Sequence, residues 1–231
     1  MIKKSNAPLL LFLEMLLGSA ATFFSLLIFL KLTGEVMENE VFPIDSQILS
    51  FFYHVRTPLL TALMINITNL GGVIMITLAV IIMIVFVIKK YFKEALIFAF
   101  LFCMSGINNV LLKNLIKRNR PQFHPLITEK DYSFPSGHAM NSFVFYFTLS
   151  YLLFHITKNK KLSITVALFS AFLVFLIGIS RIYLGVHYPS DVVGGYVGGL
   201  VWFISVLLIQ KTLAVYKIFQ TRRVSGKQKK S

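Results

Sequence analysis

Six long apolar segments account for most of this 231-residue chain and limit what it can fold into. Each is close to the roughly 20 residues that an α-helix needs to cross the hydrocarbon of a bilayer. Only 14% of the residues are charged, too few for a soluble domain with this much apolar surface. We therefore predict an all-α, polytopic membrane protein with six transmembrane helices. The predicted spans are Leu9–Leu30, Leu60–Ile88, Glu94–Leu112, Gly137–Ile156, Leu162–Leu184 and Ser190–Leu213.

The chain is expected to form a single membrane domain over residues 1–231. Its core lies at about 58–213, preceded by an N-terminal helix and outer loop at 1–57 and followed by a basic cytoplasmic tail at 214–231. The first apolar segment has no clear small-x-small cleavage site, so we expect a retained helix and not a cleaved signal. The stretch Val41–Tyr53 is predicted to form an interfacial helix.

The formal net charge of +14 raises the question of an acidic partner. The basic residues lie in short clusters between the apolar segments, as in loops that face anionic lipid. The polar tail at 222–230 is predicted to be a disordered segment at the membrane surface. We therefore expect membrane lipids as partners, with no nucleic acid and no obligate protein partner. The single cysteine, Cys103, excludes a disulfide framework and a zinc cluster of cysteines.

The lysines predict how the chain is oriented. Lys3 and Lys4, the clusters at 89–93 and 158–161, and the tail all fall on one side of the membrane if the six spans are real. The positive-inside rule makes that side the cytoplasm. The opposite segment, 33–57, carries four carboxylates and one arginine. Both termini are therefore predicted to be cytoplasmic.

One basic cluster opposes this rule. Lys113, Lys117, Arg118 and Arg120 follow the third span and fall outside, with Arg181 at the same level. A cationic cluster in a disfavoured place needs another reason, and binding a phosphate group is one. A loop that contacts outer-leaflet headgroups is the alternative.

Two segments near this cluster also carry groups suited to phosphate chemistry. Lys113 and Arg120 are seven residues apart, about two helical turns, and would share one side if the helix continued that far. Ser136 is predicted to cap the fourth span, whose free amides would form an anion site. Gly137 allows a ligand to approach the backbone closely, and His138 follows it.

A third segment reaches the same face between the fifth and sixth spans. Pro189 suits the first turn of the last helix and places Asp191 in that turn. His187 is then close enough for Asp191 to accept its ring N–H. The remaining histidines, His54, His124 and His155, are interpreted as ordinary polar residues at span ends.

In chain order, the patterns Lys-x6-Arg-Pro, Pro-Ser-Gly-His and Ser-Arg-x5-His-x3-Asp resemble the three signature motifs of the type 2 phosphatidic acid phosphatase superfamily. The resemblance implies that His187 attacks phosphorus to form a phosphohistidine, with Asp191 orienting the ring. It implies His138 as the general acid and requires neither metal nor cofactor. The phosphate-binding groups that it implies are Lys113, Arg120, Ser136, Gly137 and Arg181.

An active site at the outer membrane face suits a lipid phosphate, whose tail stays in the bilayer. The chain resembles bacterial phosphatidylglycerophosphatase B-type enzymes of the plasma membrane, which implies phosphatidylglycerol phosphate or phosphatidate as substrate. Undecaprenyl pyrophosphate, recycled as a cell-wall carrier, is the rival substrate. Two further alternatives stay open: a lipid phosphotransferase, and a non-enzymatic protein that binds or transports lipids.

Overall fold

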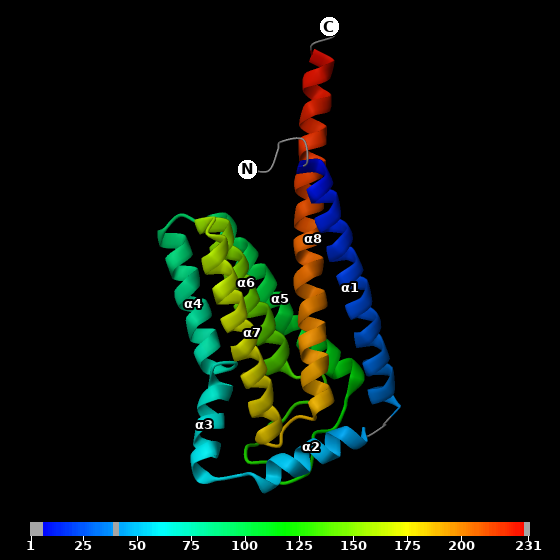
Figure 1. The fold of residues 1–231 in the computed structure, drawn as a ribbon, viewed down its shortest axis with the longest axis vertical. Helices are drawn as coiled ribbons and strands as arrows, with labels where there is room; N and C mark the ends of the chain where they lie inside the picture. The colour runs from blue at the N-terminus through cyan, green and yellow to red at the C-terminus, as the bar shows by residue number, and fades with distance from the viewer. Residues whose placement is uncertain (1–6, 39–41, 229–231) are drawn as a thin grey trace.

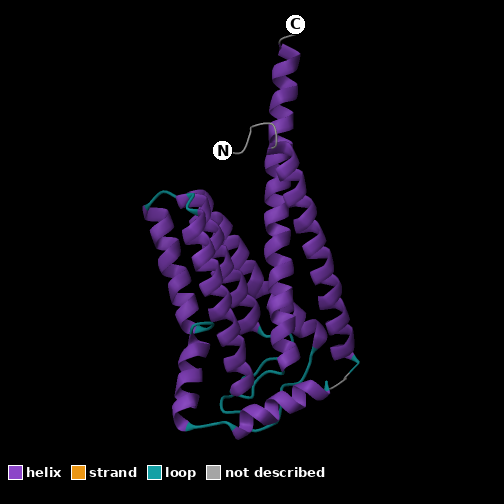
Figure 2. Ribbon diagram, in the orientation of Figure 1, coloured by secondary structure: helices purple, strands orange, loops and turns teal. Residues whose placement is uncertain are grey.

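The computed structural model describes residues 7–38 and 42–228, with side chains at 11–38 and 42–216. All regular structure in these ranges is α-helical, as predicted (Figure 2). The helices are α1 (Ala7–Met37), α2 (Pro43–His54), α3 (Pro58–Asn69), α4 (Val73–Ile88), α5 (Phe92–Ile116), α6 (Gly137–Thr157), α7 (Lys160–Tyr183) and α8 (Pro189–Gln228) (Figure 1).

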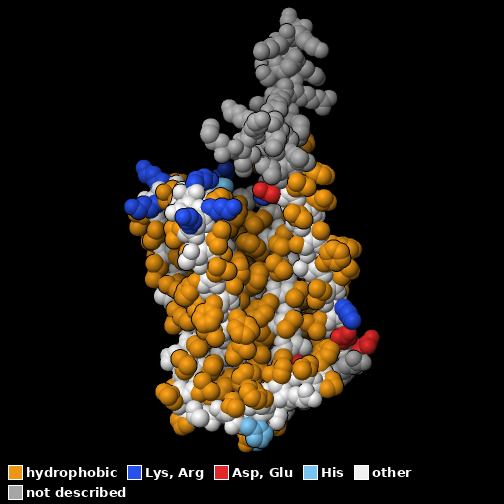
Figure 3. All heavy atoms as spheres, in the orientation of Figure 1, with side chains coloured by type: hydrophobic (Ala, Val, Ile, Leu, Met, Phe, Trp, Pro, Cys, Tyr) orange, Lys and Arg blue, Asp and Glu red, His pale blue; other side chains and the backbone are white. Residues whose placement is uncertain are grey.

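Six segments of the described chain are helical, long and apolar enough to cross a membrane, which confirms the predicted spans. The second span combines α3 and α4, which are separated by a turn at 70–72. Figure 3 shows apolar side chains covering the flank of the bundle. Lys and Arg side chains gather at the end where α4 joins α5 and α6 joins α7 (Figure 3).

Two helices are longer than predicted. The first extends to Met37 and not Leu30, because polar side chains near a membrane surface remain solvated without ending a helix. The last continues to Gln228, so the prediction of disorder at 222–228 is wrong. No proline or glycine occurs between residues 200 and 225, and a helix that is already formed propagates through such a stretch. Residues 229–231 lie outside the described chain.

The predicted interfacial segment is a helix, α2, which lies across one end of the bundle (Figure 1). Val41 lies outside the described residues, and the helix begins at Pro43. Leu49 of α2 packs in a buried cluster with Ile182 of α7 and Val192 of α8. This contact holds α2 against the ends of α7 and α8.

Helix α6 lies at the centre and packs against α4, α5, α7 and α8. Its buried Phe145 ring meets Phe98 of α5 edge-on, with ring centroids 5.7 Å apart. Two glycines of α8 allow close approach: a Cβ at Gly195 would lie 2.7 Å from the Ser136 carbonyl oxygen, and one at Gly199 would lie 3.0 Å from that of Met140. The start of α6 is thereby fixed beside the start of α8.

Candidate active site

The loop after α5 folds back on itself. Helix α5 ends at Ile116, because Lys117 adopts a left-handed conformation with φ of 54°. The helix therefore does not continue as far as Arg120, which was the condition for Lys113 and Arg120 to share one of its sides. The loop reverses instead, and Ser133 donates from its N–H (2.9 Å) and hydroxyl (3.2 Å) to the Arg118 carbonyl.

The turn between α7 and α8 depends on Gly185. Its φ is +75°, and a Cβ there would lie 3.0 Å from Arg56 Nη2 and 3.2 Å from Pro125 Cα. Both the conformation and the space favour glycine. The turn brings His187 to the bundle end, and α8 then starts at Pro189, where a helix start was predicted.

These ends surround a cavity of about 400 Å³. The predicted site residues that line it are Lys113, Arg120, Gly137, His138, Arg181 and His187. Asp191 lies behind His187, and Ser136 is buried beneath the start of α6. Three stretches distant in sequence therefore meet at one cavity, with both histidines on its wall.

The His187 ring is almost completely buried between a carboxylate and a guanidinium. Its Nδ1 lies 3.4 Å from Asp191 Oδ2, and its Nε2 lies 3.2 Å from Arg120 Nη1. Burial, and then the charges of Arg181 and Arg120, hold the pKa of His187 well below its ordinary value. The ring is therefore neutral at physiological pH. With Nδ1–H directed at Asp191, Nε2 carries the lone pair of the ring, which accepts from Arg120 Nη1 in this structure.

His138 lies beside the turn between α3 and α4. A Cβ at Gly72 would lie 3.0 Å from His138 Nε2, so the backbone of this turn forms a wall against the ring. Gly71 and Gly72 both line the cavity. In the sequence, these glycines interrupt the apolar stretch of the second span.

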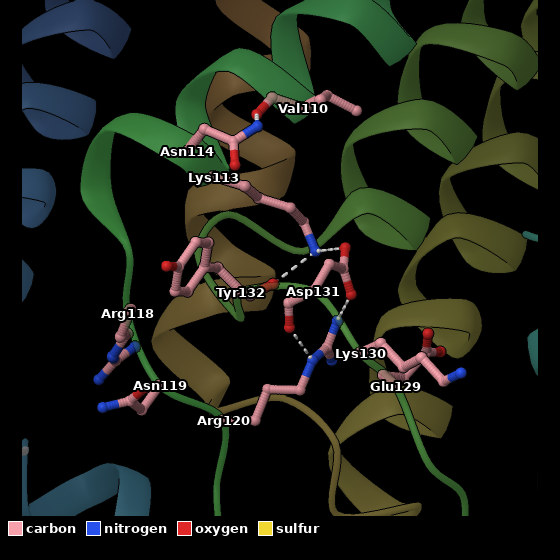
Figure 4. A pocket seen from close by; sticks show the side chains of 10 residues that line it. All are labelled: Val110, Lys113, Asn114, Arg118, Asn119, Arg120, Glu129, Lys130, Asp131 and Tyr132. Carbon is pink, nitrogen blue, oxygen red and sulfur yellow. Dashed lines mark hydrogen bonds and ion pairs between the residues drawn. The ribbon is translucent and has the colours of Figure 1, made fainter.

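The cations of the cavity are paired with two loop carboxylates that were not predicted as part of the site. Asp131 lies between Lys113 Nζ, 2.6 Å from its Oδ2, and the Arg120 guanidinium (Figure 4). Burial raises the pKa of Asp131, but hydrogen bonds from Lys113 and Arg120 outweigh it and lower that pKa to about 2. Arg181 pairs with Glu129 and donates to Thr68 Oγ1 at 2.9 Å. The cationic side chains expected to bind phosphate are therefore already ion-paired with carboxylates of the chain itself.

Ser136 lies at the start of α6, as predicted, but its side chain does not cap the helix. Its backbone is extended at this position. Its N–H donates to the Asp191 carbonyl at 2.9 Å. Within the described part of the chain, its buried hydroxyl has no hydrogen-bond partner.

Replacing Asp131 with asparagine should tighten the binding of inorganic phosphate to the purified protein about 3- to 10-fold. The substitution removes a negative charge from Lys113 and Arg120, so a phosphate dianion would no longer compete with a carboxylate. Dissociation constants for phosphate, measured beside those of a Glu38→Gln control, test this prediction. Weaker binding of phosphate to Asp131→Asn would mean that Asp131 holds the cations in place for the anion and does not compete with it.

Fold and cavity together define a helical membrane protein with a cationic site built around two histidines. Residues 94–214, more than half of the chain, match the family described as the PAP2 superfamily. The chain belongs to this superfamily, which confirms the resemblance seen in the three motifs.

Individual relatives agree with this assignment. Phosphatidylglycerophosphatase B of Bacillus subtilis is 36% identical over 182 residues, which cover 77% of this chain and 88% of that protein. The crystal structure of a transmembrane PAP2-type phosphatidylglycerolphosphate phosphatase from Bacillus subtilis superposes with a TM-score of 0.77 at 34% identity, covering 83% of this chain and 96% of that one. A putative undecaprenyl-diphosphatase of Escherichia coli is 33% identical over 90 residues, 39% of this chain and 40% of that protein.

Proposed function

We propose that this protein hydrolyses a lipid phosphate through a phosphohistidine formed on His187. The observation that carries the proposal is the single cavity in which three cationic side chains surround two histidines. Phosphoryl transfer needs charge stabilisation on the equatorial oxygens, together with a nucleophile and a proton donor in line. The cavity contains side chains suited to each of these roles.

In the first step, His187 Nε2 attacks phosphorus and the bond from phosphorus to the lipid oxygen breaks. His138, protonated at the start, gives its proton to that oxygen. In the second step, a water molecule attacks phosphorus and gives a proton to His138, while the P–N bond breaks and phosphate leaves. Asp191 holds the His187 ring in one tautomer and stabilises its positive charge during both steps.

The phosphate oxygens would be bound by the cations once Asp131 and Glu129 move aside. Lys113, Arg120 and Arg181 then face the charge that develops in the transition state. The buried Ser136 hydroxyl and the Gly137 amide would complete the set.

The composition of the cavity wall supports a lipid substrate. Beyond the cations, the wall includes Met75 and Ile76 of α4 and Phe102, Cys103 and Gly106 of α5. Ile76 and Cys103 are also exposed on the flank of the bundle, where lipid tails lie. A headgroup at His187 would therefore leave its tail between α4 and α5.

Phosphatidylglycerol phosphate is the substrate that we propose first, because the Bacillus subtilis relative matches over most of both chains. Undecaprenyl pyrophosphate is the second candidate, favoured by the shorter match to the Escherichia coli protein. A panel that compares phosphate release from these two lipids and phosphatidate in one detergent tests the order. If release were fastest from undecaprenyl pyrophosphate, the order of the two candidates would be reversed. If none of the three lipids released phosphate, the proposed phosphatase activity would be refuted.

Activity in this panel should be unchanged by EDTA. Lysine and arginine side chains supply the positive charge on the phosphate oxygens in the proposed mechanism, so a divalent ion has no part in it. Phosphate release with and without the chelator is the measurement. A strict requirement for a divalent metal would contradict the mechanism.

We further propose that both termini are cytoplasmic and that the cavity opens on the outer side of a bacterial plasma membrane. In a Cys103→Ser background, a cysteine at Gln122 should react with an impermeant maleimide on intact cells. A cysteine at Lys90, at the opposite end of the bundle, should react only after lysis. The reverse pattern would invert the topology.

A further inference from the structure

A carboxylate from α2, that of Asp45, lies buried beside Ser190, which follows His187 closely in the chain. Helix α2 itself lies outside the segment 94–214 that matches the family. Asp45 Oδ1 accepts from the Ser190 N–H at 2.9 Å, and Asp45 Oδ2 accepts from the Ser190 hydroxyl at 2.5 Å. A buried carboxylate is costly unless it is paired, so its cationic partner is informative.

That partner is Arg118. Its Nη2 lies 3.2 Å from Asp45 Oδ2, while its Nη1 donates to Asp191 Oδ1 at 2.6 Å. The guanidinium also lies over the Tyr188 ring, 4.2 Å from its centroid. One planar group therefore joins the carboxylate of α2 to the carboxylate behind His187.

The two carboxylate oxygens of Asp191 have different partners. Oδ1 accepts from Arg118, whereas Oδ2 accepts from the Tyr188 N–H at 2.8 Å and faces His187 Nδ1. A carboxylate held at both oxygens cannot rotate away from the ring. Arg118 thus contacts the carboxylate that faces His187, and Asp45 in turn contacts Arg118.

We propose that Arg118 and Asp45 are positioning residues that hold Asp191 in the orientation His187 needs for attack on phosphorus. This inference rests on the proposed function. Neither residue lines the cavity of about 400 Å³ that holds the histidines, so neither touches the phosphate. Arg118 lines a neighbouring pocket, which shares Lys113 and Arg120 with that cavity (Figure 4).

The alternative is that this network only anchors α2, and the opposite charges of the two residues allow a distinction. Loss of the Arg118 cation should favour protonation of His187, whereas loss of the Asp45 anion should disfavour it. The other charged or titratable groups around His187 are the same in every variant: Lys113, Arg120, Asp131, His138, Arg181 and Asp191.

The experiment compares Arg118→Gln, Arg118→Lys, Asp45→Asn and a Glu35→Gln control, each as purified full-length protein in detergent. Arg118→Gln should lower kcat at least about 30-fold and leave KM within about threefold. It should also shift the acid limb of the pH profile of kcat/KM to higher pH, by about half a unit or more. Asp45→Asn should lower kcat about tenfold without an upward shift of that limb. Glu35→Gln should match the original protein.

Arg118→Lys separates charge from geometry. An ammonium retains the charge but cannot bridge two carboxylates as a planar fork does, so kcat should fall while the acid limb stays in place. The positioning role is refuted if the two Arg118 variants and Asp45→Asn lose thermal stability and active fraction alike, with the acid limb of the pH profile unmoved in each. If these three variants retain full kcat while His187→Gln is inactive, only this inference fails. Activity in His187→Gln would instead refute the proposed function.

Discussion

Replacing His187 with glutamine should reduce phosphate release by at least about 10³-fold, a loss of about 4 kcal/mol in transition-state stabilisation. Glutamine is similar in size and polar but cannot form the phosphoenzyme. The His187 ring is almost completely buried, and no other histidine among the described residues contacts both Arg120 and Asp191. Single-turnover release of phosphate from purified protein is the measurement.

His155→Ala is the matched control for this substitution. His155 stacks on Tyr151 and lines a different cavity, together with Glu14 and Lys211 near the opposite end of the bundle. Its replacement should leave activity within about twofold. Full activity in the His187 variant would remove the proposed nucleophile.

Replacing Arg120 with glutamine should have the second largest effect, a 10²- to 10³-fold loss of kcat/KM, or about 3 to 4 kcal/mol. Arg120 Nη1 lies 3.2 Å from His187 Nε2, the atom expected to bond to phosphorus. It also donates to the Val186 carbonyl at 2.7 Å, which fixes its position beside the nucleophile. In the proposed mechanism, the guanidinium would therefore face the oxygens on which negative charge develops.

Lys117→Gln is the control for Arg120, because it removes a cation from the same cluster at an exposed position. Its effect on kcat/KM should stay within about threefold. If both substitutions caused equal losses, the cluster would act only by general attraction of anions to the membrane surface.

The spans and motif residues could be predicted from sequence because they depend on local signals. A helix crossing hydrocarbon needs a continuous apolar stretch, and the start of α8 at Pro189 follows from the fixed φ of proline. The juxtaposition of His138 and His187 followed from topology alone, since odd-numbered loops share one side. These inferences required no knowledge of how the loops fold.

The carboxylates around the cations could not be predicted in this way. Asp131 reaches Lys113 only because Ser133 folds the loop back onto Arg118, a non-local contact with no periodic signal. Asp45 reaches Arg118 across 73 residues, through a helix that crosses the end of the bundle. Its one sequence signal was an acidic residue in a mostly apolar stretch on the predicted outer side.

The phosphohistidine itself is the direct test of the proposed chemistry. An aryl phosphate with an alkyl tail needs no proton donor to its leaving group, so His138→Ala should still form the intermediate but lack the base that helps water to break it down. After an alkaline quench, mass spectrometry should locate one phosphate per protein on His187. Phosphate on any other residue, or turnover of the aryl phosphate with no phosphoenzyme at any time, would contradict the mechanism.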